Sequence, residues 1–94
     1  MPLFALICFD KPDSLDLRMA TREAHLVYVG QHREMLKVAG PLLDEAEAMV
    51  GSMFILEAPD HATVQAFTAD DPYNRAGLFG QVEVRGYRAS VGTL

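Results

Sequence analysis

The sequence predicts an α+β domain in which strands and helices follow one another in the order β-α-β-β-α-β. Two observations lead to this prediction: apolar runs of strand length recur along the chain, and the segments between them space apolar residues as a helix does. With right-handed crossovers this order gives the ferredoxin-like arrangement, a four-stranded antiparallel sheet with two helices on one face. In that topology the first and third strands are central, and the second and fourth lie at the edges.

The length and charge of the chain narrow its class. A length of 94 residues indicates a single domain spanning residues 1–94. The net charge of −5 argues against nucleic-acid binding and against docking on anionic membranes. Cys8 is the only cysteine, so a reducing compartment is expected. With no signal-peptide pattern and no apolar stretch near the roughly 20 residues of a membrane span, we expect a cytoplasmic protein.

The first strand and first helix follow from an apolar run and a capping signal. Pro2–Phe9 is continuously apolar, and Asp10–Asp13 ends the run, which favours a strand that is apolar on both faces. Ser14 or Asp13 can cap a helix that runs from about Leu15 to Met35.

The first helix carries an apolar stripe and a polar flank. Arg18, Arg22 and His25 follow at i, i+4 and i+7, so they share one flank beside the stripe. The stripe itself is predicted to be the buried side, with a period close to 3.6. It consists of Leu17, Ala20, Ala24, Val27, Tyr28 and Met35.

The remaining strands differ in their pattern. Leu36–Leu43 contains Pro41, which cannot donate to a ladder, so an edge strand or a bulge is expected. Asp44–Val50 is predicted as a loop or hairpin connection. Ser52–Glu57 is apolar on both faces, as a central strand is, whereas Gln81–Ser90 alternates apolar and charged residues.

The second helix is bounded by prolines. Pro59-Asp60 opens it, and Val64 and Phe67 are its expected buried positions. Because the residue before a proline avoids the α region, the helix ends before Pro72, and a short further turn begins there with Asp71 as its N-cap.

Two helices cover only one face of such a sheet. The other face is also apolar, and an exposed patch of that size is unusual on a monomer. We therefore expect a homodimer in which two sheets pack face to face. The face is expected to include some of Phe4, Leu6, Cys8, Met53, Phe54 and Ile55.

His25 and Asp71 are the candidate catalytic residues. An imidazole and a carboxylate that meet in a fold can transfer protons near neutral pH. Each also has an ordinary alternative, because His25 can be a surface residue of a helix and Asp71 a helix cap. Arg18 and Arg22 would give a cationic wall suited to an anionic or phenolic substrate, or else be solvated surface charge.

Six segments of the chain carry a resemblance by their order and spacing: Phe4–Pro12, Arg18–Leu26, Ala39–Leu42, Gly51-Ser52, Asp70–Tyr73 and Ala76–Phe79. Through these segments the chain resembles the YCII family over nearly its whole length. The resemblance implies a dimeric ferredoxin-like fold, a dimeric α+β barrel, with a His-Asp pair proposed as the active site, which maps onto His25 and Asp71. A family relative is a dehydrochlorinase of a chlorinated hydroxyhydroquinone, and the fold is similar to that of muconolactone isomerase.

These features together predict a small-molecule enzyme of the lyase, isomerase or hydrolase class that acts on a small cyclic or phenolic compound. His25 would act as the general acid or base and Asp71 would orient it. A non-catalytic ligand-binding module and a structural dimeric module are the alternatives. No cofactor is expected. The expected substrate-binding residues are Arg18, Arg22, Gly40, Pro41, Ser52 and Tyr73.

No metal site is predicted. His25 and His32 are two helical turns apart, about 10 Å along the axis. Zinc needs its nitrogen ligands about 2 Å from one ion, so these two imidazoles cannot share a metal on a straight helix.

Overall fold

A computed structural model describes residues 1–94 and has a single four-stranded antiparallel sheet. The strands lie in the order β2-β3-β1-β4, so the first and third strands are central, as the sequence predicts. Each neighbouring pair is antiparallel. The strands are β1 (Leu3–Asp10), β2 (Leu36–Leu43), β3 (Met49–Glu57) and β4 (Phe79–Tyr87).

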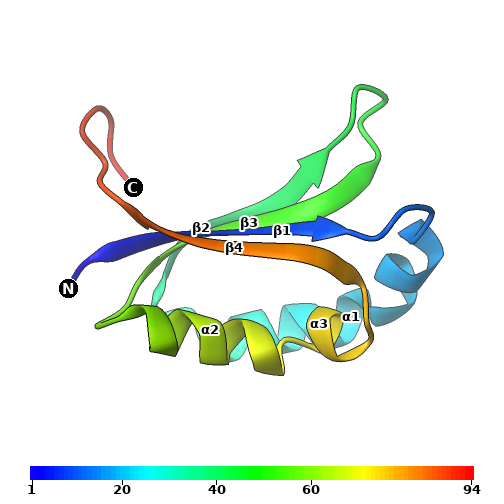
Figure 1. Cartoon of the computed structure of the whole chain (residues 1–94), viewed down its shortest axis with the longest axis horizontal. Coiled ribbons are helices and arrows are strands. Elements are labelled where there is room, and N and C mark those ends of the chain that lie inside the picture. The colour runs from blue at the N-terminus through cyan, green and yellow to red at the C-terminus, as the bar shows by residue number, and fades with distance from the viewer.

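Three helices lie on one face of the sheet (Figure 1). They are α1 (Leu15–Gln31), α2 (His61–Asp70) and the short α3 (Pro72–Arg75). Asp71 is the N-cap of α3, and its side chain accepts a hydrogen bond from the backbone N–H of Tyr73, which confirms the predicted cap. None of the helices is long and apolar enough to cross a membrane.

Several predicted boundaries differ from the structure. The first helix ends at Gln31 rather than Met35. Beyond it, the N–H groups of Met35 and Leu36 each donate to a carbonyl oxygen three residues earlier, and these turns lead the chain into β2. The third strand begins earlier, at Met49, which pairs with β2. The last strand ends at Tyr87 because it pairs with Leu3, where β1 begins.

The cap of α1 also differs from the prediction. Ser14 occupies the N-cap position, but its side chain makes no capping bond; its hydroxyl donates to the carbonyl oxygen of Pro12 instead. Asp13 precedes it with a φ of 55°. The helix start is therefore set by this tight turn and by the contacts of α1 with the sheet.

The hydrophobic core fills the space between the sheet and the helices. Val64 and Phe67 of α2 are buried in it, as predicted. The central strands supply most of the rest, because every second residue of a strand faces the helices. These strand residues are Phe4, Leu6 and Cys8 of β1 and Phe54 and Leu56 of β3.

The predicted buried face of α1 is wrong in part, because Tyr28 and Met35 of the predicted stripe pack half-buried against the core but the other four residues are exposed. Val27 of the predicted stripe is 59% exposed and Leu17 is 37% exposed, whereas Arg18 and His25 are the buried residues of the helix. Burying polar side chains costs free energy unless they are hydrogen-bonded. No buried side-chain nitrogen or oxygen atom lacks a hydrogen-bond partner here, so the polar side of α1 can face the sheet.

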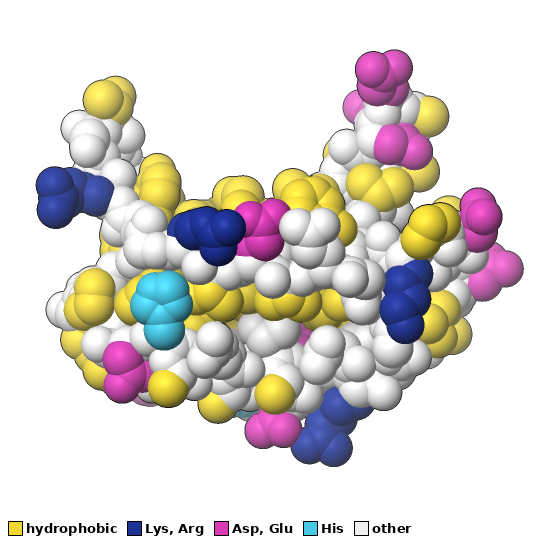
Figure 2. Space-filling view, viewed as in Figure 1, with side chains coloured by type: hydrophobic (Ala, Val, Ile, Leu, Met, Phe, Trp, Pro, Cys, Tyr) yellow, Lys and Arg dark blue, Asp and Glu magenta, His cyan; other side chains and the backbone are white.

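The opposite face of the sheet carries no helix (Figure 1). Its register pairs Ile7 with Met53 and Ala5 with Ile55, while their neighbours along each strand point to the core. The sheet curves, so that the β2–β3 turn and the C-terminal segment rise on either side of this face. Figure 2 shows hydrophobic side chains along the hollow between these two projections.

Candidate active site

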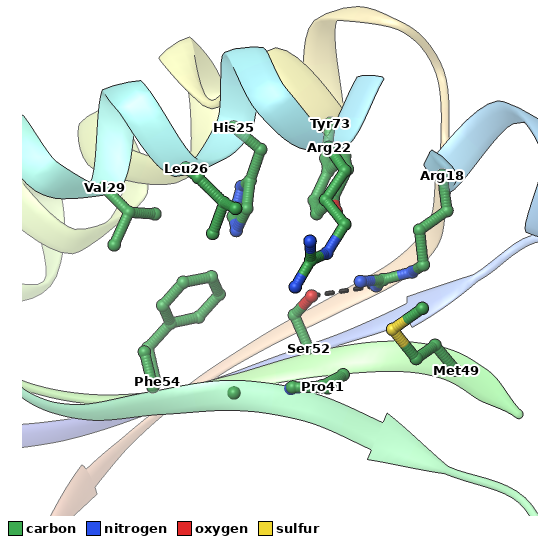
Figure 3. A pocket seen from close by; sticks show the side chains of 12 residues that line it. Arg18, Arg22, His25, Leu26, Val29, Pro41, Met49, Ser52, Phe54 and Tyr73 are labelled. Carbon is green, nitrogen blue, oxygen red and sulfur yellow. Dashed lines mark hydrogen bonds between the residues drawn. The ribbon is translucent and has the colours of Figure 1, made fainter. Parts of the chain in front are cut away.

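A cavity lies between α1 and the β2–β3 side of the sheet (Figure 3). Its volume is about 110 Å³. An apolar cavity of about 150 Å³ can hold benzene, so the space is on the scale of one six-membered ring. No carboxylate is among its lining residues, which are Arg18, Arg22, His25, Leu26, Val29, Ala39, Gly40, Pro41, Met49, Ser52, Phe54 and Tyr73.

His25 and Asp71, the predicted catalytic pair, meet at the cavity. His25 Nδ1 lies 2.8 Å from Asp71 Oδ1, and the Asp71 side chain is 1% exposed. The same Oδ1 accepts the backbone N–H of Tyr73 at 2.9 Å. Since this oxygen accepts, Nδ1 carries the hydrogen, and the neutral imidazole keeps its lone pair on Nε2.

The contact depends on two elements that are distant in sequence. His25 lies on α1, whereas Asp71 sits at the junction of α2 and α3. A proline at the first position of α3 ends α2 and fixes the cap geometry, which turns the Asp71 carboxylate inward. Asp70, the neighbouring carboxylate, instead pairs with Arg75 on the surface at 2.8 Å.

Tyr73 orients the imidazole from one side. Its ring stacks on His25 with centroids 3.9 Å apart and an interplanar angle of 15°. Arg18 Cζ lies 4.6 Å from the centroid of the same ring, a cation–π distance. Burial raises the pKa of the Tyr73 phenol, although the charges of Arg18 and Arg22 oppose this rise.

Arg18 is held in a buried ion pair. Its Nε donates to Asp10 Oδ2 at 2.7 Å, and its Nη2 donates to Asp10 Oδ1 at 3.0 Å. Nη2 also donates to Ser52 Oγ at 2.8 Å, which joins α1 to β3. Burial alone would lower the pKa of Arg18, but its bond and charge contact with Asp10 outweigh this effect, so the pKa lies above its usual value.

Arg22 differs from Arg18 in its surroundings. It is exposed and forms no ion pair, and its side chain reaches toward the cavity near Ser52 (Figure 3). Gly40 and Pro41 line the same cavity from the edge strand β2. All eight residues predicted for the site are therefore brought to one place, Asp71 through its bond to His25 and the other seven as lining residues.

Sequence reasoning missed Asp10 and the apolar lining. Asp10 reads in the sequence as part of the turn that ends β1, yet it is the partner of Arg18. A carboxylate that ends a central strand and precedes a helix with an arginine in its first turn is the signal that could have found it. The missed lining residues are Leu26, Val29, Ala39, Met49 and Phe54.

The residues of the site include neither a metal-binding cluster nor a reactive thiol. No cluster of three or more His, Cys, Asp or Glu side chains has the geometry of a metal site. Cys8 is buried in the core and does not line the cavity, and desolvation together with the charges of Asp71 and Asp10 raises its pKa to about 12. A thiol with this pKa is not a nucleophile near neutral pH.

Comparisons with known proteins agree on one family. The sequence model of one protein family, the YCII-related domain, matches residues 2–88. The protein YciI of Escherichia coli is 34% identical over 94 residues, which cover 92% of this chain and 96% of that protein.

Similar solved structures carry the same fold. The 5-chloro-2-hydroxyhydroquinone dehydrochlorinase of Burkholderia phenoliruptrix AC1100, in complex with 2,5-dihydroxybenzoquinone, has a TM-score of 0.85 and 33% identity, covering 92% of this chain and 93% of that one. An antibiotic biosynthesis monooxygenase has a TM-score of 0.56 at 19% identity, covering 97% and 100%, and shares the fold alone.

Proposed function

The chain belongs to the family of YCII-related domains, and on this basis we propose that it is an enzyme acting on a small cyclic or phenolic compound. The proposed reaction is general acid–base chemistry of the lyase, isomerase or hydrolase type. The observation that carries the proposal is the buried hydrogen bond of 2.8 Å between His25 and Asp71 at the wall of a ring-sized cavity.

His25 would transfer the proton. With Nδ1 bonded to Asp71, Nε2 is the nitrogen free to accept a proton from a substrate O–H or C–H. In an elimination, the electron pair left behind moves into the ring and expels the leaving anion, while the proton stays on Nε2. In an isomerisation, Nε2 returns the proton to another carbon. In both, the Asp71 carboxylate stabilises the imidazolium that forms.

The lining of the cavity supports a ring-shaped ligand. Phe54, Leu26 and Val29 offer apolar contact, and the exposed Arg22 offers a positive charge at the mouth. The similar dehydrochlorinase acts on a chlorinated hydroxyhydroquinone and is found in complex with a dihydroxybenzoquinone. A substituted hydroxyquinone or phenol is therefore the substrate class we propose for this chain.

The test is turnover of a panel of small ring compounds. The panel holds chlorinated hydroxyhydroquinones, ring lactones and substituted phenols, and their turnover is followed by absorbance and chromatography. We expect His25→Ala and Asp71→Asn to lose turnover but keep the fold. His61→Ala is the control, because His61 is exposed on α2 and away from the cavity. Unchanged turnover in His25→Ala would contradict the proposal.

We also propose that two copies of the chain pack through the open face of the sheet. The apolar residues of this face lie opposite the helices, and Phe9 and Met53 among them are 40% and 37% exposed in one chain, whereas Ile55 is buried. Met53→Glu would place a charge at this face, and we expect it to dissociate the dimer. Val27→Glu is the control, because Val27 is 59% exposed on the outer side of α1. A monomeric wild-type protein at micromolar concentration in sedimentation would refute the dimer.

A further inference from the structure

The buried hydroxyl of Ser52 accepts a hydrogen bond from Arg18 and donates none within the protein. It is 3% exposed, it lines the cavity from β3, and its Oγ lies 2.8 Å from Arg18 Nη2. A guanidinium group has donors only and no acceptor. Ser52 Oγ must therefore accept this bond, and its own hydrogen is left for a different partner.

The direction of this hydroxyl is set by its support. Asp10 holds the Arg18 guanidinium with bonds of 2.7 and 3.0 Å, so the donor of the 2.8 Å bond to Ser52 is fixed in place. The Ser52 hydroxyl makes no hydrogen bond as a donor within the protein, and Figure 3 shows it at the floor of the cavity. A hydroxyl that accepts from a cation is polarised and is a stronger donor.

The two walls of the cavity thus offer opposite groups. On α1, His25 presents a nitrogen lone pair at Nε2 to the cavity that it lines. On β3, Ser52 presents a hydrogen-bond donor. Because Arg18 is neutralised by Asp10, the free positive charge near this space is that of Arg22.

We propose that Ser52 donates a hydrogen bond to a negatively charged oxygen of the ligand, so that Ser52 with Arg18 behind it forms an oxyanion subsite. The ligand class is a ring that carries a phenolate or enolate oxygen on the side of the sheet and a transferable proton on the side of His25. The inference rests on the proposed function, since it assigns the second pole of the same site. It makes Ser52 a specificity-determining residue rather than a nucleophile.

A pair of simple probes tests the subsite by binding alone. 4-Nitrophenol is a single ring whose phenolate form absorbs visible light, and nitrobenzene is the same ring without the phenolic oxygen. Their dissociation constants are measured by calorimetry, and the ionisation of bound nitrophenol is followed by its absorbance as a function of pH. The proteins compared are the wild type, Ser52→Ala, Ser52→Thr and Arg22→Gln.

The expected result is a loss that depends on the ligand oxygen. A hydrogen bond to a charged group contributes enough to change affinity by about tenfold or more. We expect Ser52→Ala to bind nitrophenolate about tenfold more weakly and nitrobenzene unchanged. Ser52→Thr keeps the hydroxyl and should keep the affinity. The bound phenol should ionise at a lower pH in the wild type than in Ser52→Ala.

Several results would overturn the inference. One is that Ser52→Ala binds nitrophenolate as tightly as the wild type while Arg22→Gln does not bind it, which would assign anion binding to Arg22 alone. Another is an equal loss for both probes in Ser52→Ala, which would make Ser52 structural. No binding of nitrophenol to the wild type also overturns it. If turnover of the panel needs His25 but Ser52→Ala does not change nitrophenolate affinity, only this inference is refuted. If Ser52→Ala weakens nitrophenolate binding but no compound of the panel is turned over, only the proposed reaction is refuted.

Discussion

Replacing Asp71 by alanine removes two hydrogen bonds that end on one buried oxygen atom. Oδ1 accepts from His25 Nδ1 at 2.8 Å and from the backbone N–H of Tyr73 at 2.9 Å, and the side chain is 1% exposed. The substitution therefore removes the cap of α3 and also leaves a buried imidazole N–H without a partner.

The cost can be worked from these two losses. Removing an aspartate cap costs about 0.5–2 kcal/mol, and a buried donor left unsatisfied costs about 1–3 kcal/mol. We expect Asp71→Ala to lower the free energy of unfolding by about 2–4 kcal/mol. At a urea slope of about 1.5 kcal/mol/M for a small domain, the unfolding midpoint falls by about 1.3–2.7 M. Asp71→Asn keeps an acceptor oxygen, so about 1 kcal/mol is expected for it.

The assay is urea unfolding of all variants at one protein concentration, because association would shift the midpoint. The matched control is Asp60→Ala. Asp60 is the N-cap of α2 and its Oδ1 accepts from Thr63 N–H at 2.9 Å, but it is exposed and has no histidine partner. Asp60→Ala also loses a bond from Thr63 Oγ1 at 2.8 Å, but both bonds of Asp60 are exposed, so the greater destabilisation by Asp71→Ala reports the burial of the site together with the bond to His25. If Asp71→Ala were no more destabilising than Asp60→Ala, or if Asp71→Asn were as destabilising as Asp71→Ala, the reasoning would be refuted.

Three further predictions concern the interior. Gly51→Ala places a Cβ against the carbonyl oxygen of Cys8 on β1 and should cost about 1–3 kcal/mol in urea unfolding, whereas Gly40→Ala meets no atom and should cost little. Burial raises the pKa of Cys8 from 9.0 to about 12, so its thiolate fraction near pH 8 falls about a thousandfold. A disulfide reagent should therefore label Cys8 only when the protein unfolds, and fast labelling of the native protein would contradict this. Since the folded pKa is the higher one, this thiol's contribution to the free energy of unfolding falls as the pH rises from 9.0 to about 12. Tyr73→Phe keeps the ring stacked on His25 and should keep the melting temperature, and Tyr73→Leu should lower it; equal melting temperatures would show that the stacking does not stabilise the fold.

The strand order could be predicted because local features of the sequence are tied to positions in a sheet. A central strand whose side chains are apolar on both faces of the sheet reads as a nearly continuous apolar run, as Pro2–Phe9 and Ser52–Glu57 do. Pro41 marks β2 as an edge strand. Asp71 before Pro72 marks a cap wherever the rest of the chain goes. Each of these signals depends on a few adjacent residues only.

The inward face of α1 could not be predicted in this way. Apolar periodicity assumes that the buried side of a helix is its apolar side. Here Arg18 and His25 are buried because carboxylates from β1 and from the start of α3 meet them. These partners are 8 and 46 residues distant in sequence, beyond the spacing of three and four residues that helix periodicity reads. The same pairing explains why Asp10 was missed and why Val27 is exposed.

The spacing of the polar residues on α1 also determines how the site is divided. Arg18 and His25 are seven residues apart, about 10 Å along the helix and on the same face. Each is hydrogen-bonded to its own buried carboxylate, so the two poles of the site are fixed separately and without any contact from a ligand. Arg22 lies between them at the mouth without a partner. An anionic ring would therefore gain its long-range attraction from Arg22 and its orientation from the two buried pairs. Arg22→Gln should therefore weaken the dependence of the affinity on ionic strength, whereas Ser52→Ala should leave that dependence unchanged.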